Sequence, residues 1–97
     1  MQLKVTDNAD GKRFEAQVDD RLILLEYIKT KELFFLTHTE VPPALEGQGY
    51  GFAMVEAVLP MVEDSGLKLA PLCPFVVAYI KRHPEWKRIV SEKYNLG

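Results

Sequence analysis

The chain contains a single cysteine, Cys73, so no disulfide bond can form within it. Its formal net charge is only −2, without the basic excess that a general nucleic-acid-binding protein carries. No apolar run approaches the roughly 20 residues of a membrane-spanning helix, and the first residues contain no apolar core of a secretion signal. We therefore expect a soluble cytoplasmic protein that binds neither membranes nor nucleic acid.

Metal-binding residue types are equally scarce. The two histidines and the cysteine are well separated and match no usual ligand spacing, so we expect no metal site. Hydrophobic residues make up 47% of the chain and charged residues 27%, which is ordinary for a globular protein and argues against disorder. The length of 97 residues suits one domain with a modest core, and we interpret residues 1–97 as a single minimal domain.

The first part of the chain has the pattern of a β-meander. Residues 3–6 form a short β-like stretch, residues 13–18 alternate apolar and polar side chains, and residues 22–29 form a nearly continuous apolar run. Residues 33–41 form a third long run rich in strand formers. The short connections between these runs predict hairpins, and therefore an antiparallel arrangement.

A double proline, Pro42 and Pro43, ends that run. The apolar residues that follow share one helical face, namely Phe52, Val55, Leu59 and Val62. They predict a helix over residues 50–64, with a kink at Pro60. Residues 67–72 read as a strand that returns after this helix and should lie parallel to residues 33–41.

Two further prolines, Pro74 and Pro84, are placed to begin shorter helices over residues 74–82 and 84–90. We expect residues 93–97 to fray. The predicted fold is thus of the α/β (α+β) class: a twisted mixed sheet, with an antiparallel N-terminal meander, one parallel strand and about three helices.

Three glycines at alternate positions, Gly47, Gly49 and Gly51, separate the third long strand from the first helix. Glycine allows positive φ and close approach of the backbone to a ligand. The first turn of a helix offers N–H groups without intrahelical partners, and its dipole favours an anion. The spacing matches neither the dinucleotide-binding fingerprint nor a Walker A loop. A phosphate cradle and a plain glycine-rich turn therefore both remain open.

Two longer segments resemble a known family. They are Thr-Glu-Val-Pro-Pro at residues 39–43 and the stretch from Pro71 to Trp86, which contains Pro-Leu-Cys-Pro-Phe and His-Pro-Glu-Trp. Together they resemble the small, single-domain YjdJ-type branch of the GCN5-related N-acetyltransferases (GNAT). The resemblance runs from about Phe14 to Trp86. It implies a GNAT-like fold and acetyl-CoA as the bound molecule.

The glycine segment is similar to the acetyl-CoA loop of that superfamily, Gln/Arg-x-x-Gly-x-Gly/Ala, except that Glu46 occupies the Gln/Arg position. An acidic side chain beside a pyrophosphate is unfavourable. The resemblance implies that the backbone of Val41 contacts the pantetheine arm. It also implies that pyrophosphate contacts come from the amides of Glu46, Gly47, Gln48, Gly49, Tyr50 and Gly51.

Cys73 and Tyr79 are candidate catalytic residues. Cys73 precedes a helix N-terminus, where a thiolate is favoured, so it can serve as acyl acceptor or acid–base group. The alternative is a small, packed hydrophobe. The resemblance implies that Tyr79 protonates the departing thiolate, and the alternative is a core aromatic with a satisfied hydroxyl.

His38 and Glu40 lie two residues apart on one predicted strand, so they should point the same way. A histidine and a carboxylate on one face can relay a proton from an amine. Regular alternation places Phe34 and Leu36 on that face too, which would bury both groups. The alternative is that His38 is a hydrogen-bonded strand residue.

The resemblance favours an N-acetyltransferase that moves an acetyl group from acetyl-CoA to an amine of unknown identity. Helices that GNAT proteins usually carry between the first two strands have no counterpart here, which implies an open acceptor side suited to a protein or exposed amine, or to completion by a partner chain. The alternative is a CoA-binding module or sensor without efficient catalysis, acylated on Cys73. We expect a monomer or a weak homodimer.

Overall fold

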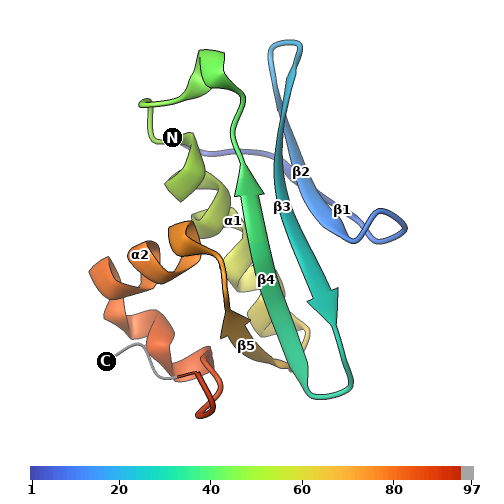
Figure 1. Cartoon of the computed structure of the whole chain (residues 1–97), viewed down its shortest axis with the longest axis vertical. Helices are drawn as coiled ribbons and strands as arrows, with labels where there is room; N and C mark the ends of the chain where they lie inside the picture. The colour runs from blue at the N-terminus through green and yellow to red at the C-terminus, as the bar shows by residue number, and fades with distance from the viewer. Residues whose placement is uncertain (95–97) are drawn as a thin grey trace.

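The computed structural model describes residues 1–94 and shows one five-stranded sheet (Figure 1). Its strands are β1 (Val5–Asn8), β2 (Arg13–Val18), β3 (Arg21–Lys29), β4 (Leu33–Glu40) and β5 (Lys68–Pro71). They lie across the sheet in sequence order. The first four pair antiparallel, and β5 pairs parallel with β4. The predicted mixed sheet with one parallel strand is therefore confirmed.

The helices follow the predicted order. They are η1 (Pro43–Leu45, 3-10), α1 (Tyr50–Asp64), α2 (Pro74–Arg82) and η2 (Pro84–Ile89, 3-10). The bounds of α1 agree with the prediction, and this helix continues through Pro60, whose side chain is exposed. The third predicted helix is a 3-10 helix rather than an α-helix. The predicted fraying over residues 93–97 falls mostly outside the described residues.

The first strand is placed later than the sequence predicts. It begins at Val5 and continues through Asn8, whereas the sequence predicted a short β-like stretch at residues 3–6. The side chain of Asn8 explains the shift, because it donates to Glu15 Oε2 and accepts from the Gly11 amide. These two bonds keep Asn8 in the sheet and move the turn beyond it.

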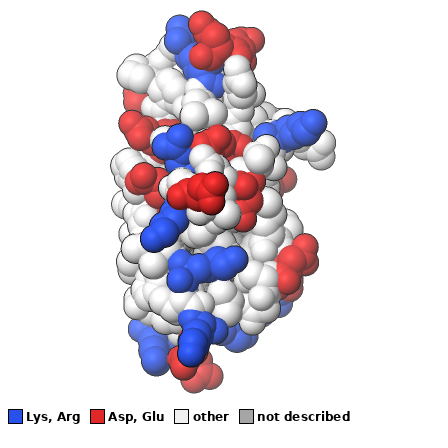
Figure 2. Space-filling view, turned by 90° about the vertical axis from the view of Figure 1, so that its right-hand side faces the viewer, with Lys and Arg blue, Asp and Glu red and all other residues white. Residues whose placement is uncertain are grey.

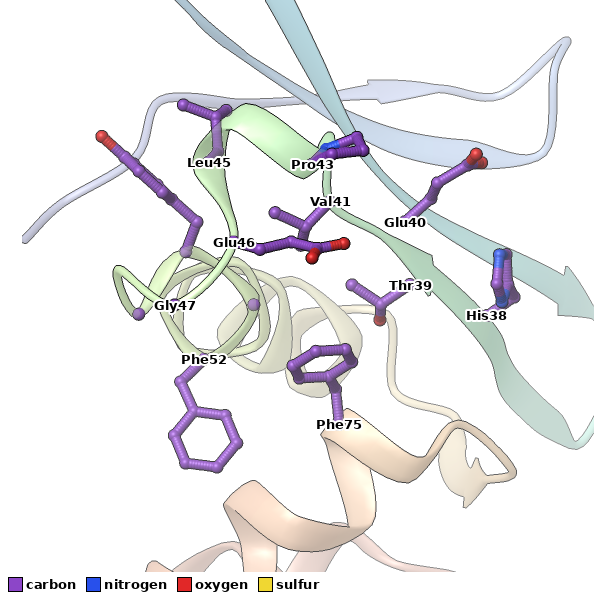
Figure 3. A pocket seen from close by; sticks show the side chains of 13 residues that line it. His38, Thr39, Glu40, Val41, Pro43, Leu45, Glu46, Gly47, Phe52 and Phe75 are labelled. Carbon is purple, nitrogen blue, oxygen red and sulfur yellow. The ribbon is translucent and has the colours of Figure 1, made fainter.

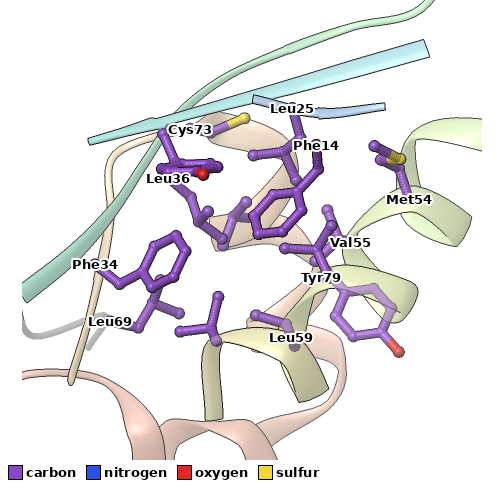
Figure 4. Packing of buried hydrophobic residues seen from close by; sticks show 14 of the residues in the cluster. Phe14, Leu25, Phe34, Leu36, Met54, Val55, Leu59, Leu69, Cys73 and Tyr79 are labelled. Atoms are coloured by element: carbon purple, nitrogen blue, oxygen red, sulfur yellow. The ribbon is translucent and has the colours of Figure 1, made fainter. Parts of the chain in front are cut away.

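One hydrophobic cluster joins the two α-helices to one face of the sheet, which we call the inner face (Figure 4). Burial of apolar surface is the main force that holds these layers together. The largest fully buried side chains include Phe14, Ile23, Leu25, Leu36, Met54, Leu59, Leu69 and Ile80. The predicted apolar and polar sides of α1 are confirmed, since Val55, Leu59 and Val62 are buried while Glu56 and Glu63 are exposed.

A β-bulge interrupts β4. Glu26 of β3 pairs with His38, but the next residue, Tyr27, pairs with Leu36, so Thr37 is an extra residue. The Thr37 hydroxyl donates to the Glu26 carbonyl oxygen at 3.1 Å. Because side chains alternate with a period of two, one extra residue moves every later side chain of the strand to the opposite face.

The free edge of β5 is partly covered by the chain that follows η2. Val90 forms an isolated parallel bridge with Leu69, and the Ser91 amide donates to the Leu69 carbonyl oxygen at 2.8 Å. The Leu69 carbonyl on this side of β5 therefore has a partner within the same chain.

The charged side chains on the face in Figure 2 are of both signs, with Asp and Glu interspersed among Lys and Arg. Within residues 1–94, no helix is long and apolar enough to cross a membrane. The same residues contain no group of three or more His, Cys, Asp or Glu side chains that can hold a metal ion.

Tyr27 gives the fold a testable pH dependence. Its ring packs on Phe14 and Phe34, and its hydroxyl donates to Asp7 Oδ1 at 2.6 Å. Burial, and then the bond to Asp7, raise the pKa of Tyr27 to about 12 from an ordinary value of 10.0. A raised pKa stabilises the fold below the unfolded value, and this stability is lost as the pH rises through the folded value.

We therefore expect titration of Tyr27 to lower the free energy of unfolding, measured by urea denaturation, by about 2 kcal/mol between pH 10 and pH 12. Tyr27→Phe should be less stable than wild type at pH 8 by about 1–2 kcal/mol, because the bond to Asp7 is lost. The difference should shrink toward pH 12. A Tyr27→Phe profile parallel to that of wild type over this range would contradict the assignment.

Candidate functional site

A cavity of about 760 Å³ opens where β4 ends (Figure 3). Its described lining comes from the end of β4, the glycine loop and the first turns of α1 and α2: His38, Thr39, Glu40, Val41, Pro43, Leu45, Glu46, Gly47, Gly49, Tyr50, Gly51, Phe52 and Phe75. Most of the residues predicted for acetyl-CoA are therefore brought together at one place.

The cavity exists because β4 and β5 separate. Their parallel pairing covers only Leu33 to Leu36 of β4, while β4 itself continues to Glu40. Beyond this point, the amides of Leu72 and Cys73 both donate to the Leu36 carbonyl oxygen, each at 3.0 Å. The chain then leaves the sheet for α2. The second half of β4 is left without a strand neighbour on this side among the described residues.

The glycine loop, residues 46–51, lines the cavity with Glu46, Gly47, Gly49, Tyr50 and Gly51. Gly47 and Gly49 have φ values of 77° and 88°, in the left-handed region that favours glycine. The first hydrogen bond of α1 runs from the Ala53 amide to the Gly49 carbonyl oxygen, and no side chain caps this helix. The amides before Ala53, at residues 50–52, therefore have no intrahelical partner, and the positive end of the helix dipole lies beside them.

Gly51 has a different role from the other two glycines. A Cβ atom at this position would lie 2.4 Å from Cε1 of Phe75, so only glycine lets that ring rest against the start of α1. Phe75 is 41% exposed and also meets Phe52 edge to face. The guanidinium of Arg82 lies over the ring of Phe52, 5.2 Å from its centroid. These rings give one side of the cavity an apolar wall.

Cys73 lies beneath the cavity rather than on its surface. It is 1% exposed and belongs to the hydrophobic cluster. Its sulfur is 3.1 Å from Oγ1 of Thr39, which does line the cavity. This burial is what the alternative of a small, packed hydrophobe predicts for Cys73. The acyl-acceptor and acid–base roles of Cys73 stay predictions.

The predicted environment of His38 and Glu40 is wrong. Both side chains are exposed and point away from the glycine loop in Figure 3. They do not share the buried face of Phe34 and Leu36, because the extra residue Thr37 reverses the alternation. Their catalytic roles stay predictions, now for two groups at the solvent-facing rim of the cavity.

Tyr79 is placed in the core, 6% exposed, between two rings. Its ring meets Phe52 at 5.6 Å edge to face and stacks on His83 at 4.1 Å. Burial, followed by the carboxylates of Glu56 and Glu85, raises the pKa of Tyr79. The hydroxyl therefore keeps its proton, as an acid must, but Tyr79 is not among the described residues that line the cavity.

Two predicted loop residues differ in their environment. Glu46 is exposed at the cavity, and Figure 3 shows its carboxylate in the space between Val41 and Phe75. Gln48 points elsewhere, because its side-chain amide donates to the Ala44 carbonyl oxygen at 3.2 Å. Only the backbone of Gln48 is then available to a ligand.

Sequence reasoning missed several cavity residues, among them Thr39, Phe52 and Phe75. Phe75 follows the proline that begins α2, so its place in the first turn of a helix was a usable signal. Thr39 carried no such signal, because regular alternation from Phe34 assigns it to the outer face. Its inward position follows from the bulge alone.

Comparison with known proteins matches residues 13–89 to the family described as GCN5-related N-acetyl-transferase. Protein NATD1 of Mus musculus is 29% identical over 85 residues, which cover 84% of this chain and 77% of that protein. The NATD1 proteins of Gallus gallus and Homo sapiens are each 35% identical to this chain over 65 residues, which cover 67% of this chain. These two matches span 59% and 58% of the relatives, less than two thirds of their length.

The contact between Gly51 and Phe75 predicts a coupling that a double-mutant cycle can measure. Gly51→Ala alone should displace the Phe75 ring, since the new Cβ has no room. In a Phe75→Ala background the same change should stabilise the protein by about 0.5–1 kcal/mol, because alanine is the better helix former. Urea denaturation of the four proteins gives the coupling energy. Equal effects of Gly51→Ala in the two backgrounds would show that the ring does not depend on this glycine.

Proposed function

Because this chain belongs to the GCN5-related N-acetyltransferase family, we propose that it binds acetyl-CoA in the cavity at the end of β4 and transfers the acetyl group to an amine. Membership of the family supports acetyltransferase activity in general, and members of the family bind acetyl-CoA. The identity of the molecule bound here and of the amine acceptor belongs to the proposal.

One observation carries the proposal. The unpartnered amides at the start of α1 line a cavity that also borders the open half of β4. A pyrophosphate fits the amide end, because backbone donors and the helix dipole both favour an anion there. A thin, partly apolar arm fits the other end, against Val41, Phe52 and Phe75. The carboxylate of Glu46 is the unfavourable element, since it faces the same space.

The chain's own residues have separable roles in this proposal. Gly47 and Gly49 take the positive φ values that this loop shape requires, and their role is to offer backbone amides to the pyrophosphate. The backbone of Val41 continues the open edge of β4 and can pair with an amide-containing arm. Acetyl-CoA supplies the activated thioester. His38 and Glu40, at the exposed rim, are placed to accept a proton from an approaching amine.

The rim of the cavity also bears on the acceptor. β1 and β2 are joined by a tight turn, so no helix is inserted there to cover the outer face of the sheet. An acceptor amine can therefore reach the end of β4 from solvent or on the surface of a larger molecule. The proposed acceptor class is a primary amine that is exposed on a protein or carried by a small molecule.

A second candidate is a CoA-binding module without efficient catalysis. The exposure of His38 and Glu40 favours it, because neither group is held in the desolvated setting that tunes a catalytic base. The burial of Cys73 argues against its acylation in this candidate, since the sulfur does not reach the cavity surface in the described structure.

Mass spectrometry of the protein incubated with acetyl-CoA and a panel of amines separates the two candidates. The proposed enzyme forms acetylated amine in proportion to the protein present. The binding module retains CoA affinity but yields no product above the uncatalysed rate.

Calorimetry of CoA with Gly49→Val tests the location of the site. Valine at φ 88° is strained and alters the amide cradle. Gly66→Val is the matched control, because Gly66 has a φ of 78° at the opposite end of α1. We expect a loss of affinity of about tenfold or more in Gly49→Val only, corresponding to about 1.4 kcal/mol. Equal CoA affinity in folded Gly49→Val and wild type would move the site away from the loop.

Glu46 should weaken CoA binding through its charge. Glu46→Arg replaces repulsion of the phosphates by attraction, so we expect affinity to rise about tenfold at low salt, with a smaller gain at high salt. Glu32→Arg makes the same charge change in the turn before β4, and it should leave the affinity nearly unchanged. Titrations at two salt concentrations measure the effect. An equal gain in both variants would point to the overall charge and not to Glu46.

A further inference from the structure

Two polar side chains are buried among the residues that the structure describes, Thr39 and Ser91. Ser91 Oγ accepts from the Lys93 amide, outside the cavity. Thr39 is 7% exposed and lines the cavity. A buried hydroxyl is unfavourable unless it has a hydrogen-bond partner. The partner of Thr39 is the sulfur of Cys73, at 3.1 Å from Oγ1.

This pair has two hydrogen-bond arrangements, because either atom can be the donor. A hydroxyl has one hydrogen and two acceptor positions, and a thiol is a weak donor and a weak acceptor. When Thr39 donates to the sulfur, the pair is satisfied without a ligand. When the Cys73 thiol donates to Oγ1, the hydrogen of the Thr39 hydroxyl is free for another acceptor, and Thr39 is a residue of the cavity lining.

Hydrogen bonds to neighbouring backbone groups position both members of the pair. Thr39 lies opposite Leu25 in the sheet, and the bulge that turns it inward is fastened by the bond from Thr37 to Glu26. Cys73, directly before α2, is held by the hydrogen bond that its backbone N–H donates to the Leu36 carbonyl oxygen. The two side chains can therefore exchange donor and acceptor roles without backbone movement.

We propose that the Thr39 hydroxyl donates a hydrogen bond to the sulfur of CoA, and that Cys73 is the positioning residue that frees this hydroxyl by donating to it. This inference rests on the proposed function. In the transfer, a C–N bond forms and the thioester C–S bond breaks, with the electron pair passing to sulfur. One amine proton passes to His38 or Glu40 at the rim and from there to solvent, and one solvent proton returns to the sulfur. Thr39 keeps its own proton throughout.

The geometry favours Thr39 over the two residues that the sequence suggested for this task. The Cys73 sulfur is covered by Thr39, and Tyr79 is packed between Phe52 and His83, so neither presents an atom to the cavity as described. A threonine hydroxyl also stays uncharged over the working pH range. Its contribution should therefore be the same at every pH, unlike that of a titrating acid.

Two ligands that differ only at the sulfur, CoA and desulfo-CoA, give a readout other than activity. We expect wild type to bind CoA about fivefold more tightly than desulfo-CoA, the value of one ordinary hydrogen bond. Thr39→Val should remove most of this ratio, and Thr39→Ser should retain it. Thr6→Val, at an exposed position of β1, is the control for loss of a hydroxyl from a strand.

The same variants should change kcat and KM to different extents. We expect Thr39→Val to lower kcat about tenfold or more with KM nearly unchanged, because a bond to a developing thiolate is stronger than one to a neutral thiol. The pH profile of kcat should keep its shape. Cys73→Ala should lower kcat less and reduce the CoA to desulfo-CoA ratio partly, since the hydroxyl remains but is no longer oriented.

Three outcomes overturn the inference. The first is a ratio of CoA to desulfo-CoA affinity in Thr39→Val equal to that of wild type. The second is an equal loss in Thr39→Val and Thr39→Ser, which marks a packing effect. The third is a pH profile whose shape changes when the hydroxyl is removed. A wild-type protein that binds neither ligand would instead overturn the proposed function, and this inference with it.

Discussion

Thr37 has no partner residue of its own on β3, and the bond from its hydroxyl to the Glu26 carbonyl oxygen holds this irregularity in place. The consequences extend along the rest of β4. Before the bulge, the side chains on the inner face pack in the core, as Leu36 does. After it, the alternation is reversed, so Thr39 turns toward the cavity and His38 toward solvent. A bulge next to a functional site is a common device for re-aiming side chains.

The cavity depends on a second, independent feature, the early end of β5. Parallel pairing stops at Pro71, and α2 begins three residues later with Pro74. The open half of β4 is thereby placed beside the N-terminus of α1, so that unpaired strand groups and unpaired helix amides border one space. Neither set has a partner within its own element. The Phe75 ring completes the enclosure only because Gly51 leaves room for it.

Much of this arrangement can be predicted from the sequence. Period-two alternation and short turns predict the meander, and the glycines and the apolar stripe predict α1 with its observed bounds. The GNAT resemblance and the family match agree over most of the chain, although the particular branch stays a prediction. The bulge cannot be predicted in this way, because Thr37, His38 and Thr39 read as regular alternation. The extra residue appears only when β4 is aligned with β3, and the error in placing His38 and Glu40 follows from that.

The contact of Val90 and Ser91 with Leu69 bears on the behaviour of the protein at high concentration. A sheet with an open edge offers its backbone to any extended chain, which is a route to aggregation. In this protein that route is partly blocked at β5 by the chain's own backbone. The remaining edge, β1, is only four residues long and carries Asp7, whose carboxylate is engaged by Tyr27. Growth of the sheet by addition of foreign strands is therefore disfavoured at both outer edges.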